Sequence, residues 1–275
     1  MDGSHPSKQP VPNEHIVSLD WFRTELQAAW SFAEDWDAEL AVPYDVKRVR
    51  ARYELPDGTD YDNPVAGIHH RDETLEGLAD LRLLFSRRWS GVVFDADTLR
   101  VGAGFTIPTG RIEENPYELA ALGIKHQHIQ FGNGTVDPLA RVDYAVALGR
   151  WSLAGAFSMQ VPLYENRHEY LGAELYEASV AGRWSPFDAL TLGVSYAVLY
   201  QSRGYWDGEA DENSGYVLQA VSAMAAVRVS TSVTLTARAL RPFRIETRGG
   251  GDSYETDWIV NVGLELAWGR RAAEK

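Results

Sequence analysis

Apolar and polar residues alternate with a period of two along almost the whole chain of 275 residues, and helical periodicity is nearly absent. Successive side chains of a β-strand point to opposite faces, so this pattern predicts strands with one apolar and one polar face. The segment 258–268 is the clearest, because apolar residues alternate there with Asn261, Gly263 and Glu265. Eleven such segments can be counted, at residues 21–32, 38–46, 81–85, 99–107, 142–148, 153–161, 176–183, 190–200, 217–227, 233–239 and 258–268.

The links between these strands are alternately short and long. The short links are 33–37, 89–97, 149–151, 184–189 and 230–232, and the long links are 47–76, 108–135, 162–170, 202–214 and 243–256. Short periplasmic turns and long extracellular loops are typical of outer-membrane barrels, whose apolar face points outward to lipid. A soluble sandwich would instead turn its polar face to water. We therefore predict an all-β, antiparallel transmembrane β-barrel.

The tryptophans support this orientation, because they gather toward the two ends of the predicted strands. Trp residues in transmembrane barrels form girdles at the two membrane interfaces. At the short-turn or C-terminal end lie Trp36, Trp89, Trp151, Trp184 and Trp268, and toward the other end lie Trp21, Trp206 and Trp258.

The strand count is odd, whereas single-chain bacterial barrels usually have an even number of strands. The segment 21–32 leads into a short turn, so an upward strand should precede it. Residues 10–19 are a poor candidate, because the segment is short and holds two prolines. We expect eleven visible strands and twelve by design, with the first strand weak or removed together with a signal peptide. The expected organisation is a polar segment at 1–19, the barrel at 20–269 and a tail at 270–275.

Three segments resemble a known group of membrane proteins. They are GLADLRLLFSRRW (77–89), VGAGFTIPTGR (101–111) and GTVDPLARVDYAVALGRWSLAGAFSM (134–159). They resemble the outer-membrane barrel family named for the meta pathway of phenol degradation, whose members are also called transporters. In that family a Gly-Leu-Gly-Asp strand pair leads to a Leu-Pro-Thr-Gly rim, and here Ala79 replaces the second glycine. The resemblance implies an outer-membrane barrel and carries little information about its solute.

Composition excludes several classes of protein and partner. The chain has 26 basic and 39 acidic residues, a net charge of −13, which argues against nucleic acid as a partner. The absence of cysteine excludes disulfides and thiolate metal sites. No apolar run is long enough for a transmembrane helix, although transmembrane strands need no such run. The expected partners are the lipid bilayer of the outer membrane and small solutes; the oligomeric state is left open.

The polar face of the predicted barrel carries charges of both signs in nearly equal number. A barrel of twelve strands is intermediate between a filled interior and an aqueous channel. These side chains can therefore form a salt-bridged filling or line a narrow polar pore, and both readings stay open. The predicted pore-lining residues are Arg23, Glu25, Glu39, Asp80, Arg82, Arg100, Arg141, Asp143, Glu177, Arg238 and Glu265; Arg88, Arg183 and Arg228 share this face.

Histidines gather in the predicted extracellular loops, close to many carboxylates. His126 and His128 stand two residues apart, so on an extended segment their rings face the same way. Imidazole and carboxylate together suit copper, zinc, nickel or iron. A divalent-metal site at the mouth, with His126 and His128 as its centre and His69 or His70 completing it, is one interpretation. The other is that these histidines are solvated or hydrogen-bonded. In the same loop, Asn115 and Pro116 predict a short helix at 116–122.

No catalytic constellation is evident, so we do not expect an enzyme. The His-bearing segment 125–135 contains no serine, and no Gly-x-Ser-x-Gly elbow occurs. The favoured function is a passive outer-membrane channel for small solutes, with acidic loops that favour cations or neutral molecules at the mouth. A closed barrel that binds a divalent metal, and a soluble barrel that binds an apolar ligand, are the alternatives.

Overall fold

The computed structural model describes residues 2–6, 11–64, 66–68, 71–249 and 253–268. One antiparallel sheet of fourteen strands dominates the structure. Eleven strands of eight or more residues form its body: β2 (Glu14–Ala33), β3 (Trp36–Glu54), β5 (Leu81–Ser90), β6 (Asp97–Ile107), β7 (Pro138–Leu148), β8 (Trp151–Gln160), β10 (Leu175–Phe187), β11 (Leu190–Gln201), β14 (Tyr216–Arg228), β15 (Val233–Thr247) and β17 (Ile259–Leu266).

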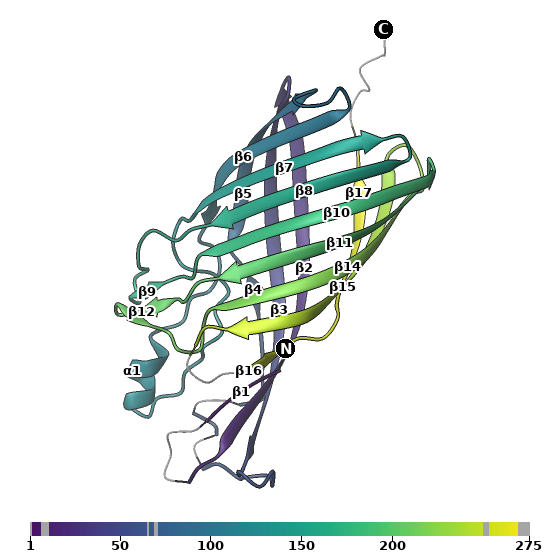
Figure 1. Ribbon diagram of the computed structural model, residues 1–275. Helices are drawn as coiled ribbons and strands as arrows, with labels where there is room; N and C mark the ends of the chain where they lie inside the picture. The colour runs from purple at the N-terminus through teal and green to yellow at the C-terminus, as the bar shows by residue number, and fades with distance from the viewer. Residues whose placement is uncertain (1, 7–10, 65, 69–70, 250–252, 269–275) are drawn as a thin grey trace.

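The remaining elements are short and lie toward one end of the sheet (Figure 1). They are β1 (Asp2–Pro6), β4 (Glu73–Leu78), β9 (Tyr170–Leu171), β12 (Tyr205–Trp206), β13 (Glu209–Ala210), β16 (Ser253–Glu255) and the helix α1 (Pro116–Ala121). No helix in the described part of the chain is long and apolar enough to cross a membrane.

The long strands follow each other in chain order, each paired antiparallel with the next. Tight turns join them at one end, and longer segments join them at the other, where α1 and the small sheet of β9, β12 and β13 lie (Figure 1). The predicted eleven strands and the alternation of short and long links are therefore confirmed. The predicted helix is confirmed too: Asn115 caps it and accepts a hydrogen bond from the backbone N–H of Tyr117 at 3.0 Å.

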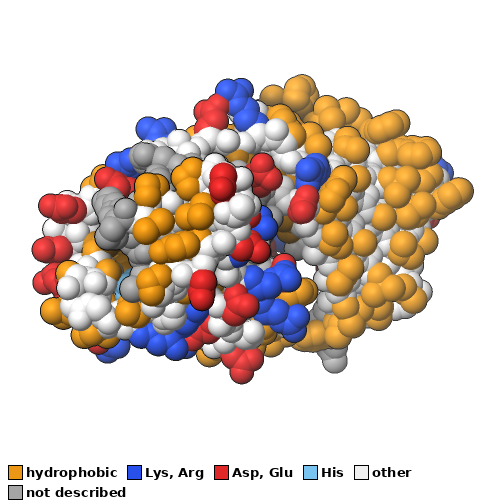
Figure 2. Space-filling view, turned by 90° about the horizontal axis from the view of Figure 1, so that it is seen from below, with side chains coloured by type: hydrophobic (Ala, Val, Ile, Leu, Met, Phe, Trp, Pro, Cys, Tyr) orange, Lys and Arg blue, Asp and Glu red, His pale blue; other side chains and the backbone are white. Residues whose placement is uncertain are grey.

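The apolar side chains of the strands point outward and are exposed. Leu26 on β2 is 72 % exposed, Val194 on β11 is 67 % exposed and Val262 on β17 is 83 % exposed. Hydrophobic side chains cover the strand-bearing part of the surface in Figure 2, whereas charged side chains gather toward the other end. Arg23 and Glu25 on β2 and Glu265 on β17 alternate with these apolar residues and lie on the opposite, inner face. The orientation expected for a barrel that faces lipid is the one observed.

Strands β2 and β3 are longer than predicted. Residues 14–20 were assigned largely to a polar N-terminal segment and residues 47–54 to a loop, but they form one ladder in which Glu14 faces Glu54. The sequence KRVRARYE at 47–54 does alternate, with arginines outside and buried Val49 and Tyr53 inside. The pattern was missed because its exposed positions are basic rather than neutral and polar.

Trp206 does not belong to an exposed aromatic girdle, and that expectation was wrong. Its side chain is only 5 % exposed and packs on Tyr170, with ring centroids 4.5 Å apart. Strand β12 places it in the small sheet with β9 and β13, where burial against another aromatic ring stabilises it more than an interfacial position would. Trp36, Trp151 and Trp258 are exposed on the outer face as predicted.

The two ends of the series of long strands, β2 and β17, are not joined by hydrogen bonds among the described residues. The short strand β1 pairs with the start of β2 and with β16, so it links the two ends only at the side of the long loops. A cavity of about 1130 Å³ lies between β2 and the start of β17. The predicted twelfth spanning strand stays a prediction.

A charge on the outer face should destabilise the fold in lipid, depending on depth. We expect Val194→Arg to lower the free energy of unfolding in lipid vesicles by about 2–4 kcal/mol, because an arginine near mid-membrane loses its water. Val229→Arg is the matched control, since Val229 is similarly exposed, at 61 %, but lies in a turn. Its expected cost is about 0–1 kcal/mol. Equal costs in denaturant titrations would contradict an outer face in contact with lipid.

Candidate functional site

The inner faces of the strands enclose a cavity of about 580 Å³. Its charged lining consists of Glu39 on β3, Arg82 on β5, Arg100 on β6, Arg141 on β7 and Glu177 on β10. All five occupy inward positions of the alternating pattern. The polar face of the sheet therefore surrounds a space large enough for a small molecule, and this space is the candidate site.

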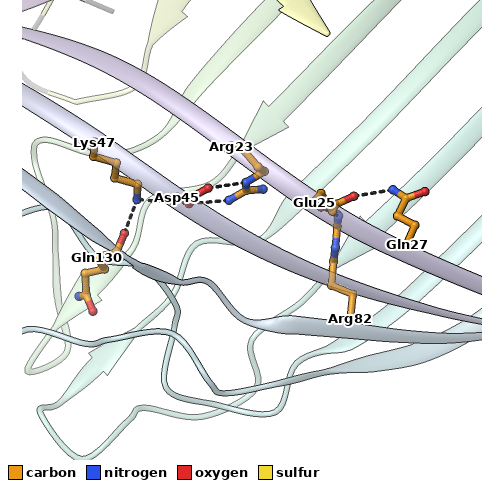
Figure 3. Close-up of polar contacts among 7 residues, drawn as sticks. All are labelled: Arg23, Glu25, Gln27, Asp45, Lys47, Arg82 and Gln130. Carbon is orange, nitrogen blue, oxygen red and sulfur yellow. Dashed lines mark hydrogen bonds and ion pairs between the residues drawn. The ribbon is translucent and has the colours of Figure 1, made fainter. Parts of the chain in front are cut away.

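Ion pairs on β2 and β3 neutralise much of the charge at one side of this cavity (Figure 3). Arg23 donates two hydrogen bonds to the fully buried Asp45, at 2.7 and 2.9 Å. Arg82 reaches from β5 to Glu25 at 2.5 Å, and Gln27 donates to the same carboxylate. A buried charge is tolerated only when it is paired, so these contacts are what allow carboxylates on the inner face.

Ion pairs of the same kind continue along β3, β5, β6 and β7. Arg88 lies 2.8 Å from Asp37, and Arg100 pairs with Glu39 and lies 3.8 Å from Asp37. In the same way Arg141 on β7 donates to Asp143, two residues further along the strand, at 2.8 and 2.9 Å. The side of the lumen formed by β2 to β7 is thus a belt of mutually paired charges.

The other predicted pore-lining residues are not part of the lining of this cavity. Glu25 and Asp143 are the partners of lining arginines, and Arg23 borders the second cavity between β2 and β17. Arg238 on β15 donates to serine hydroxyls, Glu265 lies on β17 and is exposed, and Asp80 lies at the rim between β4 and β5.

Sequence reasoning missed the apolar part of the lining, because it considered only charged residues for the inner face. Leu84, Leu139, Leu175 and Leu199 line the cavity together with the charged residues. The available signal was the run of two adjacent leucines at 83–84, since only one of them can point outward. The lumen therefore presents polar and apolar surface side by side.

Asp80 anchors the long loop between β6 and β7 to the rim. Its carboxylate accepts the backbone N–H of Gly110 at 2.9 Å and that of Asn133 at 2.8 Å, so one side chain holds both arms of the loop. Burial raises the pKa of Asp80 and the charge of Asp137 adds to this, while the two amide hydrogen bonds oppose it.

Asp137 forms a second anchor, at the end of the same loop and fully buried. Its carboxylate accepts hydrogen bonds from Asn133 at 2.7 Å, from Thr135 at 2.5 Å and from Gln160 at 2.7 Å. Its backbone N–H donates to the hydroxyl of Thr106 on β6 at 2.9 Å. Because this carboxylate has neutral partners on β8 and in the loop, it ties the loop to the wall without a salt bridge.

A third contact closes the loop over β3. Lys47 donates to the backbone carbonyl of Gln130 at 2.6 Å, as Figure 3 shows, and its ammonium lies 4.5 Å from the ring centroid of the buried Phe131. The helix α1, in the same loop, lies beyond the ends of the long strands (Figure 1), and Tyr117 donates from there to Asp211 at 2.6 Å. The mouth is therefore a packed structure rather than a set of separate loops.

The structure brings together two of the four histidines considered for a metal site. The rings of His126 and His128 lie 5.4 Å apart, but His126 is buried and its Nδ1 lies 2.9 Å from the carbonyl oxygen of Ile124. His69 and His70 lie outside the described residues. Within the part of the chain that the structure describes, no group of three His, Cys, Asp or Glu could hold a metal ion.

Comparisons with known proteins agree with the fold. No protein-family model and no curated protein matches the chain. Among solved structures, a crystal structure of an outer membrane channel from Pseudomonas putida F1 is similar, with a TM-score of 0.59 and 12 % sequence identity over 96 % of this chain and 90 % of that chain. At this identity the likeness shows the fold, an outer-membrane-type β-barrel. The predicted link to phenol degradation stays a prediction.

Removal of the Asp80 carboxylate should loosen the loop. We expect Asp80→Ala to increase the rate of tryptic cleavage after Lys125 several-fold, because the N–H groups of Gly110 and Asn133 lose a charged acceptor, worth about 1.5–3 kcal/mol per bond. Asp57→Ala is the control, since Asp57 lies in another loop and its only hydrogen-bond donor among the described residues is Thr59. Equal cleavage rates for the wild type and Asp80→Ala would show that Asp80 does not hold the loop.

Proposed function

We propose that the protein is an outer-membrane β-barrel that lets small solutes pass by diffusion through its lumen. The observation that carries this proposal is the division of the sheet into an exposed apolar outer face and an inner face that surrounds a polar cavity of about 580 Å³. The likeness to an outer membrane channel supports the barrel, and the cavity supports passage.

The outer face argues against the alternative of a soluble barrel. Soluble proteins rarely expose a continuous apolar patch of more than a few hundred square ångströms, and here exposed apolar side chains follow strand after strand. Lipid is the solvent in which such a surface is stable. The location in the outer membrane is part of the proposal.

The lumen suits small solutes rather than large ones. Paired arginines and carboxylates project into it, and the anchored loop between β6 and β7 covers part of its mouth. Leucines among these charges offer apolar contact to a passing molecule. We infer a narrow path with mixed polar and apolar walls.

Conductance in a planar bilayer tests this function. We expect the refolded protein to produce discrete, ohmic current steps in potassium chloride, because water and ions should enter a lumen lined by charged groups. Insertion can be checked independently by protection of the strands from added protease. A protein that inserts but carries no current would refute the proposal of an open channel.

The acidic first long loop should set part of the selectivity at the mouth. We expect the combined change of Asp57, Asp60 and Asp62 to Asn to lower the preference for cations, since negative charge at a mouth concentrates them. The measurement is the reversal potential in a salt gradient, repeated at high salt, where screening should reduce the difference. An unchanged reversal potential at low salt would rule this loop out as a selectivity element.

A second candidate function is the binding of a divalent metal at the mouth, favoured by the 5.4 Å separation of the His126 and His128 rings. We expect the change of both histidines to alanine to abolish binding of zinc, copper or nickel in calorimetry, if the site exists. His168→Ala is a control, because His168 lies in another loop next to Arg167. Retained affinity in the double variant would exclude this pair as ligands.

A further inference from the structure

Three arginines on the inner face, Arg183, Arg228 and Arg238, differ from all the paired ones, and Arg228 lies apart from the other two at the short-turn end of β14. Arg183 on β10 and Arg238 on β15 occupy inward positions, yet no carboxylate of the described residues lies within 4.0 Å of either guanidinium. By contrast, ion pairs join each arginine of the other wall to a carboxylate, namely Arg23, Arg82, Arg88, Arg100 and Arg141.

Arg183 and Arg238 converge on β11, one of the two strands that lie between them in the sheet. Arg183 faces Gly193 of β11 in the ladder, and its Cγ lies 3.3 Å from the place that a Cβ of Gly193 would occupy. Arg238 comes from the other side and donates to the hydroxyl of Ser195 on β11 at 3.4 Å. Gly193 and Ser195 are successive inward positions, about 7 Å apart along a strand.

Serine hydroxyls fix the position of one of the two guanidinium groups. Arg238 donates from Nε to Ser222 at 2.9 Å, and the hydroxyls of Ser222 and Ser195 lie 2.7 Å from each other. One serine must donate its hydrogen to the other, which leaves one hydroxyl hydrogen of the pair for a further acceptor. Arg238 itself has five N–H donors, of which these contacts use two.

Among the described residues, no carboxylate forms an ion pair with Arg183 or Arg238, and the acids on the same strand or the next are distant. On the same face, Glu177 stands six residues from Arg183 along β10, about 20 Å at the rise of an extended strand. Glu265 on β17 stands four residues beyond Asn261, which faces Arg238, so it is about 13 Å away along that strand. Two like charges directed toward the same strand repel each other, and an anion bound between them would offset this repulsion.

We propose that Arg183 and Arg238, with Ser195 and Ser222, form an anion-binding site on the inner wall of the barrel that recognises the carboxylate of a small solute. This inference deepens the proposed function and rests on it, since the site faces the path that solutes are proposed to take. The absence of a side chain at Gly193 lets Met224 and Arg183 pack across β11, since their Cγ atoms lie 2.9 and 3.3 Å from the ideal Cβ position of Gly193.

The chemistry of the donors favours a carboxylate. A guanidinium is planar and presents its N–H groups as a fork that matches the two oxygens of a carboxylate. The two serines add a hydroxyl donor beside it. An inorganic oxyanion such as phosphate shares part of this chemistry, and the experiment below separates the two.

The test is calorimetric titration of the refolded, detergent-solubilised protein with sodium propionate, 1-propanol and inorganic phosphate. We expect saturable binding of propionate, none of propanol, and at least about tenfold weaker binding of propionate in the variant Arg183→Gln/Arg238→Gln. Arg228→Gln is the matched control: it removes an inward arginine from β14 at the short-turn end, outside the site, and should leave the affinity unchanged.

The single variant Arg183→Gln covers the case in which the double variant does not fold. It should fold like the wild type, because the side chain of Arg183 makes no polar contact in the described structure. Its affinity for propionate should fall at least about threefold. Unchanged propionate affinity in folded Arg183→Gln, or phosphate binding that is tighter than propionate binding, would overturn the proposal.

Single-channel current separates this inference from the proposed function. In an open channel, propionate should reduce the current saturably, and the effect should be lost in the double variant and kept in Arg228→Gln. Propionate binding without any current would refute the channel and keep the site. Current that propionate blocks equally in the wild type and the double variant would refute the site and keep the channel.

Discussion

The need to pair every backbone N–H and C=O is the constraint from which the rest of this structure follows. In lipid no water is available to satisfy these groups, so a spanning sheet must be continuous and each strand must pair on both sides. Here strands β3 to β15 meet this condition along the chain order. Among the long strands, only β2 and β17 have one edge that no other long strand pairs with. The short strands β1 and β16 link these two edges at one end. The cavity beside β2 is therefore where the wall is least constrained.

The same constraint decides where charges can lie. Because the outer face is largely apolar, most charged side chains at the centres of the strands are directed inward, where neighbouring strands are about 4.8 Å apart. Arg87 and Arg241 instead lie over tryptophan rings of the outer face. Opposite charges on adjacent strands then meet, as Arg82 and Glu25 or Arg23 and Asp45 do. Against this background an inward arginine without a carboxylate partner has N–H donors available for a negatively charged solute.

Much of the fold could be predicted from the sequence because it depends on local patterns. The alternation located all eleven long strands, and Asn115 followed by Pro116 located the helix. The extension of β3 through Lys47 to Glu54 was not found, because its polar positions are arginines and its stability depends on the ladder with β2. The contacts that hold the mouth together could not be predicted: Asp80 and Asn133 are far apart in sequence, and the pairing of β5, β6 and β7 brings them together.

The two walls of the lumen have different electrostatic roles. On the wall from β2 to β7, each arginine is held by a carboxylate, so the field of this wall largely cancels a short distance away. On the wall from β10 to β15, no carboxylate of the described residues pairs with Arg183 or Arg238, and serine hydroxyls hold Arg238 instead. A solute with one negative group and an apolar body would meet the N–H donors of Arg183 and Arg238 on the second wall and the leucines that line the cavity. The asymmetry of the lumen, more than the net charge of −13, is therefore what should determine which solutes bind inside the barrel.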